Sequence, residues 1–127
     1  METQPMSKAR KITGWILVGL LSAFIIMTGV IKLISHEDSE PAQNFIKWGL
    51  EGKLMLIGIA ELISIILFLI PKTSSLGVLL LSGYFGGAIA THLEHGISFI
   101  FPAIILLLIW IANYLRNPEM LASFRKK

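Results

Sequence analysis

The chain has 127 residues, of which 54% are hydrophobic, only 15% are charged and none is cysteine, and its formal net charge is +3. Soluble domains carry about 25% charged residues, so the composition excludes an ordinary soluble protein and predicts one integral membrane domain over residues 1–127. The lack of cysteine excludes disulfide bonds, thiol redox chemistry and cysteine-based metal sites. No basic stripe interleaved with aromatic residues is present, so nucleic acid is not an expected partner.

The first predicted membrane span covers residues 12–34. It follows a polar segment that carries Lys8, Arg10 and Lys11. A span needs about 20 apolar residues, and this run is too long for the core of a signal peptide and lacks a small-residue cleavage site. We therefore expect it to stay in the membrane as a helix, with Lys32 near its end.

A mixed segment, residues 44–53, precedes the second predicted span. Its apolar residues, including Trp48, alternate with Lys47, Glu51 and Lys53. Apolar residues with interspersed charges are typical of a segment that lies at the membrane surface. The pattern predicts a short interfacial helix or a reentrant cap in the first outer loop.

The second predicted span covers residues 54–70 and contains Glu61. Placing an acidic residue at the centre of a membrane helix costs about 3 kcal/mol, and such residues usually mark functional sites. Glu61 lies seven residues beyond Leu54, or about 10 Å below the membrane boundary at 1.5 Å per residue. The alternative is that Glu61 is only a structural partner for Lys32 or for a backbone group.

The third predicted span covers residues 76–93 and is rich in small residues. Gly83 and Gly87 form a GxxxG pair, and Gly86 belongs to a second pair of small residues with Ser82. Helices in lipid associate by close packing at such residues. We therefore expect these glycines to pack against other helices of the same chain.

The fourth predicted span covers residues 97–115 and contains Pro102. Proline inside a helix removes one backbone hydrogen bond. A kink is therefore expected near Ser98, one turn earlier.

These elements predict an all-α fold, an integral membrane four-helix bundle with up-down topology. Its orientation follows from the basic residues, which concentrate on the cytoplasmic side of membrane proteins. With four spans, eight Lys and Arg residues lie on the same side of the membrane as the two termini, and three lie on the side of the first outer loop. We expect a multi-pass protein of the cytoplasmic membrane with both termini in the cytoplasm. The eight are Lys8, Arg10, Lys11, Lys72, Arg116, Arg125, Lys126 and Lys127, and the three are Lys32, Lys47 and Lys53.

Three polar residues, Lys32, Glu61 and His92, are predicted to reach a similar depth in the outer half of the bundle. Gly29 shares a helix face with Lys32, and Gly58 shares one with Glu61, as the helical repeat requires. Small residues beside a polar one indicate a face that packs against other helices. We expect Gly29 and Gly58 to be packing positions and the three polar residues to converge.

His92, Glu94 and His95 lie close together in the sequence but do not amount to a metal site. A metal site requires three or four converging ligands with supporting contacts. No metal is therefore expected, and no nucleophilic centre for catalysis is visible.

Three segments resemble motifs of the DoxX-like family at matching places along the four spans. The first resembles that family's Gly-x-x-Lys-Leu signature, the second carries the glutamate, and the third resembles its Gly-Ala-x-x-Thr-His stretch. The segments are Gly29-Val30-Ile31-Lys32-Leu33, Gly58-Ile59-Ala60-Glu61-Leu62 and Gly86-Gly87-Ala88-Ile89-Ala90-Thr91-His92-Leu93.

This resemblance implies a four-helix bundle with a longer first outer loop and polar family positions at Lys32, Glu61, Thr91 and His92. Namesakes of the family accompany membrane oxidoreductases, including a thiosulfate–quinone system and a superoxide-linked assembly. The resemblance and the polar residues together suggest a small membrane subunit, not an enzyme by itself, that binds a quinone or a lipid and serves an oxidoreductase partner. A second copy of the chain is left open as a further partner.

Two other functions stay open at this stage. One is a proton-coupled exporter similar to small multidrug resistance proteins, which also have four helices and one embedded glutamate, although theirs lies on the first span. The other is a scaffold or assembly factor without a ligand, in which the polar residues form a structural network.

Overall fold

The computed structural model describes residues 8–35, 39–50 and 52–124, and in this part of the chain every regular element is a helix. The elements are α1 (Lys8–Ile34), α2 (Glu40–Lys47), α3 (Leu54–Leu69), the 3₁₀ helix η1 (Pro71–Thr73), α4 (Ser74–Glu94), α5 (Ile100–Arg116) and the 3₁₀ helix η2 (Pro118–Phe124). The basic residues at 125–127 and Glu51, which entered the sequence predictions, lie outside the described residues.

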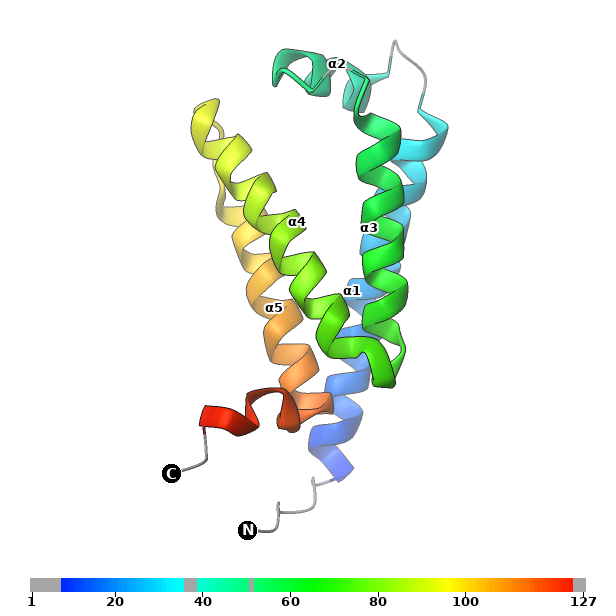
Figure 1. The fold of residues 1–127 in the computed structure, drawn as a ribbon, viewed down its shortest axis with the longest axis vertical. Coiled ribbons are helices and arrows are strands. Elements are labelled where there is room, and N and C mark those ends of the chain that lie inside the picture. Colours follow the sequence, from blue (N-terminus) through cyan, green and yellow to red (C-terminus); the bar gives the residue numbers. More distant parts are fainter. Residues whose placement is uncertain (1–7, 36–38, 51, 125–127) are drawn as a thin grey trace.

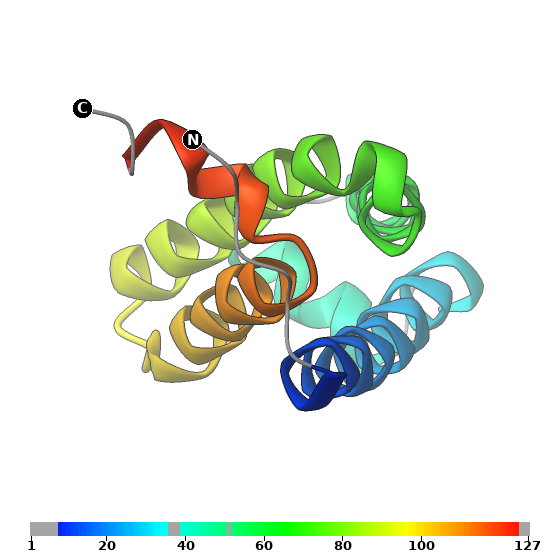
Figure 2. The ribbon, with the colours of Figure 1, turned by 90° about the horizontal axis from the view of Figure 1, so that it is seen from below.

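The four long helices form a ring of antiparallel neighbours. α1 packs against α3 and α5, and α4 packs against the same two helices. Figure 1 shows α1 and α3 as one pair and α4 and α5 as the other, and Figure 2 shows the two pairs from below. The start of α1 and the end of α5 lie at one end of the bundle, called here the terminal end, while α2 crosses the opposite end, the α2 end. The predicted all-α four-helix bundle is confirmed.

Several helix boundaries differ from those predicted. α1 begins four residues early, at Lys8, because lysine, alanine and arginine favour a helix and extend it beyond the apolar run. α5 begins late, at Ile100. Pro102 therefore lies in the first turn, where a backbone N–H has no partner within the helix. The expected kink near Ser98 was wrong, since Ser98 precedes the helix.

α2 is the short helix predicted in the first loop, but it covers Glu40–Lys47 and not residues 44–53. Its first turn is capped by Ser39, whose side chain accepts a hydrogen bond of 3.4 Å from the backbone N–H of Ala42. Such a cap satisfies a donor that has no partner within the helix. Gly49, with a φ of 78°, lies in the left-handed region that ends helices. The cap and the glycine explain why the helix lies earlier in the chain than its apolar pattern predicted.

The outside of the bundle is apolar on all four long helices. Leu20 is 65% exposed, Leu56 62%, Leu79 65% and Leu107 60%. Large exposed apolar surfaces on a helical bundle indicate contact with lipid or with another protein. Among the described residues, α1 and the segment Pro71–Glu94 are long and apolar enough to cross a membrane, while α3 and α5 are shorter apolar helices.

The core lies between the two helix pairs, toward the terminal end. Its fully buried apolar side chains interdigitate across all four long helices, which is the close packing expected of a protein interior. They include Val18, Ile25, Ile65, Phe68, Leu81 and Ile109.

The closest helix contact is at Gly77, where α4 meets α3. A Cβ atom at Gly77 would lie 2.3 Å from the backbone nitrogen of Phe68, far inside van der Waals distance. In contrast, Gly83, Gly86 and Gly87 have no neighbouring atom within 4 Å of such a Cβ position. The expectation that these three glycines pack against other helices of the chain was wrong, because they lie on the exposed face of α4.

Gly77→Ala is expected to lower the free energy of unfolding by about 1–2 kcal/mol, because the added methyl group meets backbone and forces the two helices apart. Gly83→Ala is the matched control: its methyl group meets nothing, and alanine favours the helix by about 1 kcal/mol. Thermal unfolding in a mild detergent, followed by circular dichroism, measures both. Equal melting temperatures for the two variants would contradict the contact at Gly77.

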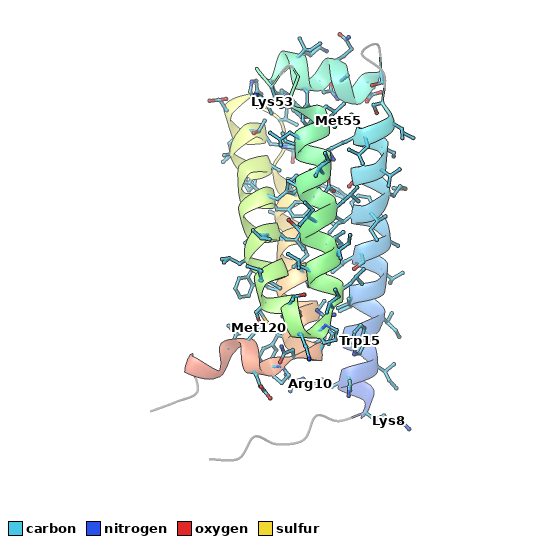
Figure 3. All side chains as sticks on the ribbon, turned by 45° about the vertical axis from the view of Figure 1, so that its right-hand side comes forward. Lys8, Arg10, Trp15, Lys53, Met55 and Met120 are labelled. Carbon is cyan, nitrogen blue, oxygen red and sulfur yellow. The ribbon has the colours of Figure 1, made fainter. Side chains whose placement is uncertain are left out.

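Arg116 ties the terminal end of the bundle together and is buried, with 7% exposure. Its guanidinium donates hydrogen bonds to the backbone oxygens of Phe68 and Leu69 at 2.6 and 3.2 Å, and to the side chain of Asn113 at 2.6 Å. The two carbonyls belong to the last turn of α3, where helical oxygens have no partner within the helix. The guanidinium also lies 4.8 Å from the ring centre of Trp15, which is labelled in Figure 3. Arg116 thus caps α3 and joins it to α5 and α1.

Candidate functional site

A cavity of about 790 Å³ lies at the α2 end, between the two helix pairs. Its volume falls within the about 300–1,000 Å³ of pockets that hold small molecules. All five α-helices contribute to its wall, which combines aromatic and aliphatic side chains with several polar groups. The aromatic residues are Phe24, Phe45, Trp48, Tyr84, Phe85 and Phe101, and the polar ones that matter below are Thr28, Lys32, Glu61, Thr91 and His92.

Glu61 is the buried polar centre of this wall, with 1% exposure. Its Oε1 accepts hydrogen bonds of 2.9 Å from Lys32 Nζ and of 2.9 Å from the Tyr84 hydroxyl. Its Oε2 accepts a hydrogen bond from the Thr28 hydroxyl, whose single proton is shared with the backbone oxygen of Ile25 at 2.9 Å. An ionised carboxylate is an acceptor only, so these three donors suit the charged form. Removing Thr28 would leave Oε2 without a partner, whereas Oε1 would keep one donor if either Lys32 or Tyr84 were removed.

Two glycines bring α1 and α3 close enough for this ion pair to form. A Cβ atom at Gly58 would lie 3.0 Å from the Cβ of Lys32, and one at Gly29 would lie 2.8 Å from Leu62 Cδ2. Small residues of this kind allow helices in lipid to approach closely. As a result Lys32 reaches Glu61 across the helix interface and keeps 15% exposure of its side chain toward the cavity.

His92 and Thr91 also line the cavity, but they are bonded within α4 instead of to Glu61. His92 Nδ1 lies 2.7 Å from the backbone oxygen of Ala88, and the Thr91 hydroxyl donates to the backbone oxygen of Gly87 at 2.9 Å. His92 lies eight residues beyond Tyr84, the α4 residue that reaches Glu61; this is about 12 Å along the helix. The three predicted polar residues therefore divide into a bonded pair, Lys32 and Glu61, and a separate histidine.

The histidine lies at the mouth of the cavity, beneath the segment that follows α2. The ring centre of Trp48 is 5.8 Å from that of His92 and 6.4 Å from that of His95. Trp48 also lies 5.6 Å from Phe45 of α2. These ring contacts join α2 and the residue that follows it to the end of α4 at the mouth of the cavity.

Sequence reasoning missed two partners of Glu61, Thr28 and the hydroxyl of Tyr84. Thr28 precedes Lys32 by four residues, the spacing that places two side chains on one helix face, and this signal was available. Tyr84 had no comparable signal, since only the packing of α4 against α3 brings it to Glu61.

Within the part of the chain that the structure describes, no three His, Cys, Asp or Glu side chains gather closely enough to hold a metal ion. The cavity and its Lys32–Glu61 pair are therefore the candidate site. A wall of apolar side chains with a few polar groups is typical of pockets that bind mostly apolar molecules with a polar group.

The sequence model of the DoxX-like family matches residues 16–112. This range contains α2, α3 and α4, most of α1 and α5, and every polar residue of the cavity discussed above. No curated protein and no solved structure matches the chain. The family match and the two long apolar helices together indicate an integral membrane protein.

Proposed function

Because the chain belongs to the DoxX-like family, we propose that it is a small membrane subunit that binds a lipophilic molecule, a quinone or a lipid, and serves a membrane oxidoreductase. The observation that carries the proposal is the position of Glu61. It lies in the wall of an aromatic cavity of about 790 Å³, with 1% exposure and three hydrogen-bond donors. Ionisable groups in membrane helices usually mark ligand or proton pathways.

In this proposal the α2 end faces outward and both termini face the cytoplasm. Lys8, Arg10, Lys11 and Lys72 support this orientation, since all four lie at the terminal end of the bundle and basic residues favour the cytoplasmic side. The ligand would then bind in the outer half of the membrane, under α2.

The proposal is tested by comparing the wild-type protein with the double variant Lys32→Met/Glu61→Gln in lipid nanodiscs. The probe is radiolabelled decylubiquinone, and empty nanodiscs give the background. The double variant is expected to bind it at least about tenfold more weakly, since a lost hydrogen bond to a charged donor is worth about 1.5–3 kcal/mol. Lys72→Met, which removes an exposed lysine at the other end of the bundle, is the control and should bind like wild type. Failure of the wild-type protein to bind the probe would contradict a quinone site.

The Lys32–Glu61 pair also bears on the exporter alternative. A proton-coupled exporter needs a carboxylate that exchanges its proton with its substrate, whereas Glu61 is held at 2.9 Å by a lysine. This pairing supports the binding role. Transport that depends on a proton gradient in proteoliposomes would favour the exporter instead. For a scaffold without a ligand, the double variant would leave assembly with a partner intact, because buried ion pairs are often replaceable.

A further inference from the structure

α3 and α4 touch at the terminal end and separate toward the α2 end, as Figure 1 shows. Near the terminal end they are in backbone contact at Gly77. Further along, the hydroxyl of Tyr84 bridges the gap to Glu61 at 2.9 Å. At the α2 end, the ring of Trp48 lies 5.8 Å from that of His92. Two side-chain contacts of α4, from Tyr84 to Glu61 and from His92 to Trp48, therefore lie about two helical turns apart along the side where α4 separates from α3.

Gly87 lies on α4 between these two contacts. It lines the cavity and is exposed, and no atom lies within 4 Å of its Cβ position. An exposed cavity-lining residue with no side chain and no neighbouring atom leaves open space in the wall at this point of α4. Gly86, the preceding residue, is equally exposed and equally free of neighbours but does not line the cavity.

On the opposite side of the cavity, an aromatic pair links α1 and α5. The ring centres of Phe24 and Phe101 lie 5.7 Å apart in an edge-to-face arrangement, which is a favourable geometry for two aromatic rings. An apolar chain would meet these rings on that side, whereas at Gly87 it meets open space.

The charges in the cavity wall indicate which head group fits. Lys32 and Glu61 form an ion pair, so their charges cancel and a charged ligand gains no net attraction from the pair. The other carboxylate of the wall, Glu40 at the start of α2, is exposed, and it disfavours an anionic head group. A lysine ammonium has three N–H donors, and one of them is used by Glu61 at 2.9 Å. A donor on Lys32 can therefore bind an oxygen acceptor on an uncharged head, while the aromatic wall contacts the ring or chain beside it.

We infer that the site takes an uncharged amphiphile with a hydrogen-bond-accepting head and a long apolar tail, which enters from the bilayer through a window at Gly87 and leaves its tail there. The inference rests on the proposed function and adds to it the ligand class and the route. Lys32 holds the head, and the tail passes between α3 and α4 into lipid.

The test uses two probes with the same benzoquinone head: decylubiquinone, which has a tail, and ubiquinone-0, which has none. Binding to wild type and to Gly87→Ala, Gly87→Leu and Gly87→Phe is measured in nanodiscs. The same three substitutions at Gly86 are the matched controls. All of these residues favour a helix over glycine, and no atom lies near either Cβ position. The graded series still reports on the window if the largest variant folds poorly.

Decylubiquinone affinity is expected to fall with side-chain size at Gly87, by about tenfold or more for phenylalanine, and to stay within about twofold of wild type in the Gly86 series. Ubiquinone-0 affinity should change little in either series, whereas Lys32→Met/Glu61→Gln should weaken both probes. Equal decylubiquinone affinity in the two glycine series would overturn the window while leaving the proposed function in place. A wild-type protein that binds neither probe would instead overturn the proposed function.

Discussion

Glu61→Gln is expected to lower the free energy of unfolding by about 2–3 kcal/mol, the largest effect of a single substitution in the candidate site. The change leaves the ammonium of Lys32 without its counter-charge, in a side chain that is only 15% exposed. Removing one partner of a fully buried ion pair costs about 3–5 kcal/mol, and the residual exposure of Lys32 reduces this. Thermal unfolding in detergent should show a melting temperature lower by on the order of 10 °C.

The double variant Lys32→Met/Glu61→Gln is the control for this effect. It removes both charges, and glutamine can still bond with the hydroxyls of Thr28 and Tyr84, which lie at the carboxylate in the native protein. Replacing both members of a buried pair is often close to neutral, so most of the lost stability should return. A double variant as unstable as Glu61→Gln alone would show that the ion pair is not the source of the loss. Since the double variant also lacks the donor of Lys32, it should be stable and yet bind decylubiquinone at least about tenfold more weakly than wild type.

Arg116→Met is expected to lower the free energy of unfolding by about 2 kcal/mol. Methionine keeps the apolar part of the side chain but leaves the backbone oxygens of Phe68 and Leu69 without the donors that now lie at 2.6 and 3.2 Å. A buried acceptor without a partner costs about 1–3 kcal/mol. The contact of the guanidinium with Trp15, at 4.8 Å, is lost as well.

Arg116→Lys separates these contributions. Lysine keeps the charge but not the planar fork that reaches several acceptors at once, so it should recover only part of the stability. Lys72→Met removes an exposed basic residue from the same end of the bundle and should melt like wild type. An Arg116→Met variant with unchanged stability would contradict the role of Arg116 as the cap of α3. Because the cavity lies at the other end, decylubiquinone binding by folded Arg116→Met should match wild type.

The candidate site was partly predictable, and the reason differs from residue to residue. Glu61 and Lys32 were evident because charged residues are rare and costly in apolar helices. Their contact also depends on the close approach of α1 and α3 at Gly29 and Gly58. His92 was expected to join them, but it lies about two helical turns beyond Tyr84, the residue on α4 that reaches Glu61. Depth estimated from helix boundaries was too coarse to detect that separation.

The small residues show the same limit. Gly77 and the trio of Gly83, Gly86 and Gly87 are of one residue type on one helix, yet Gly77 meets the backbone of α3 and the others meet nothing. The GxxxG spacing favoured the wrong glycines. A glycine of α4 is packed only where α4 lies close to α3. The two helices are close at the end where the short η1 segment connects them, and they separate toward the end that α2 crosses.

By itself the sequence determined the membrane class, the number of long helices, their up-down order and the identity of the buried carboxylate. It could do so because apolar run length, short connections and an isolated charge are local properties of the chain. Only the tertiary structure decided that Thr28, Lys32 and Tyr84 meet Glu61, that His92 does not, and that Gly87 lines the cavity. These outcomes depend on the relative rotation and separation of helices, which are set by packing between residues far apart in the sequence.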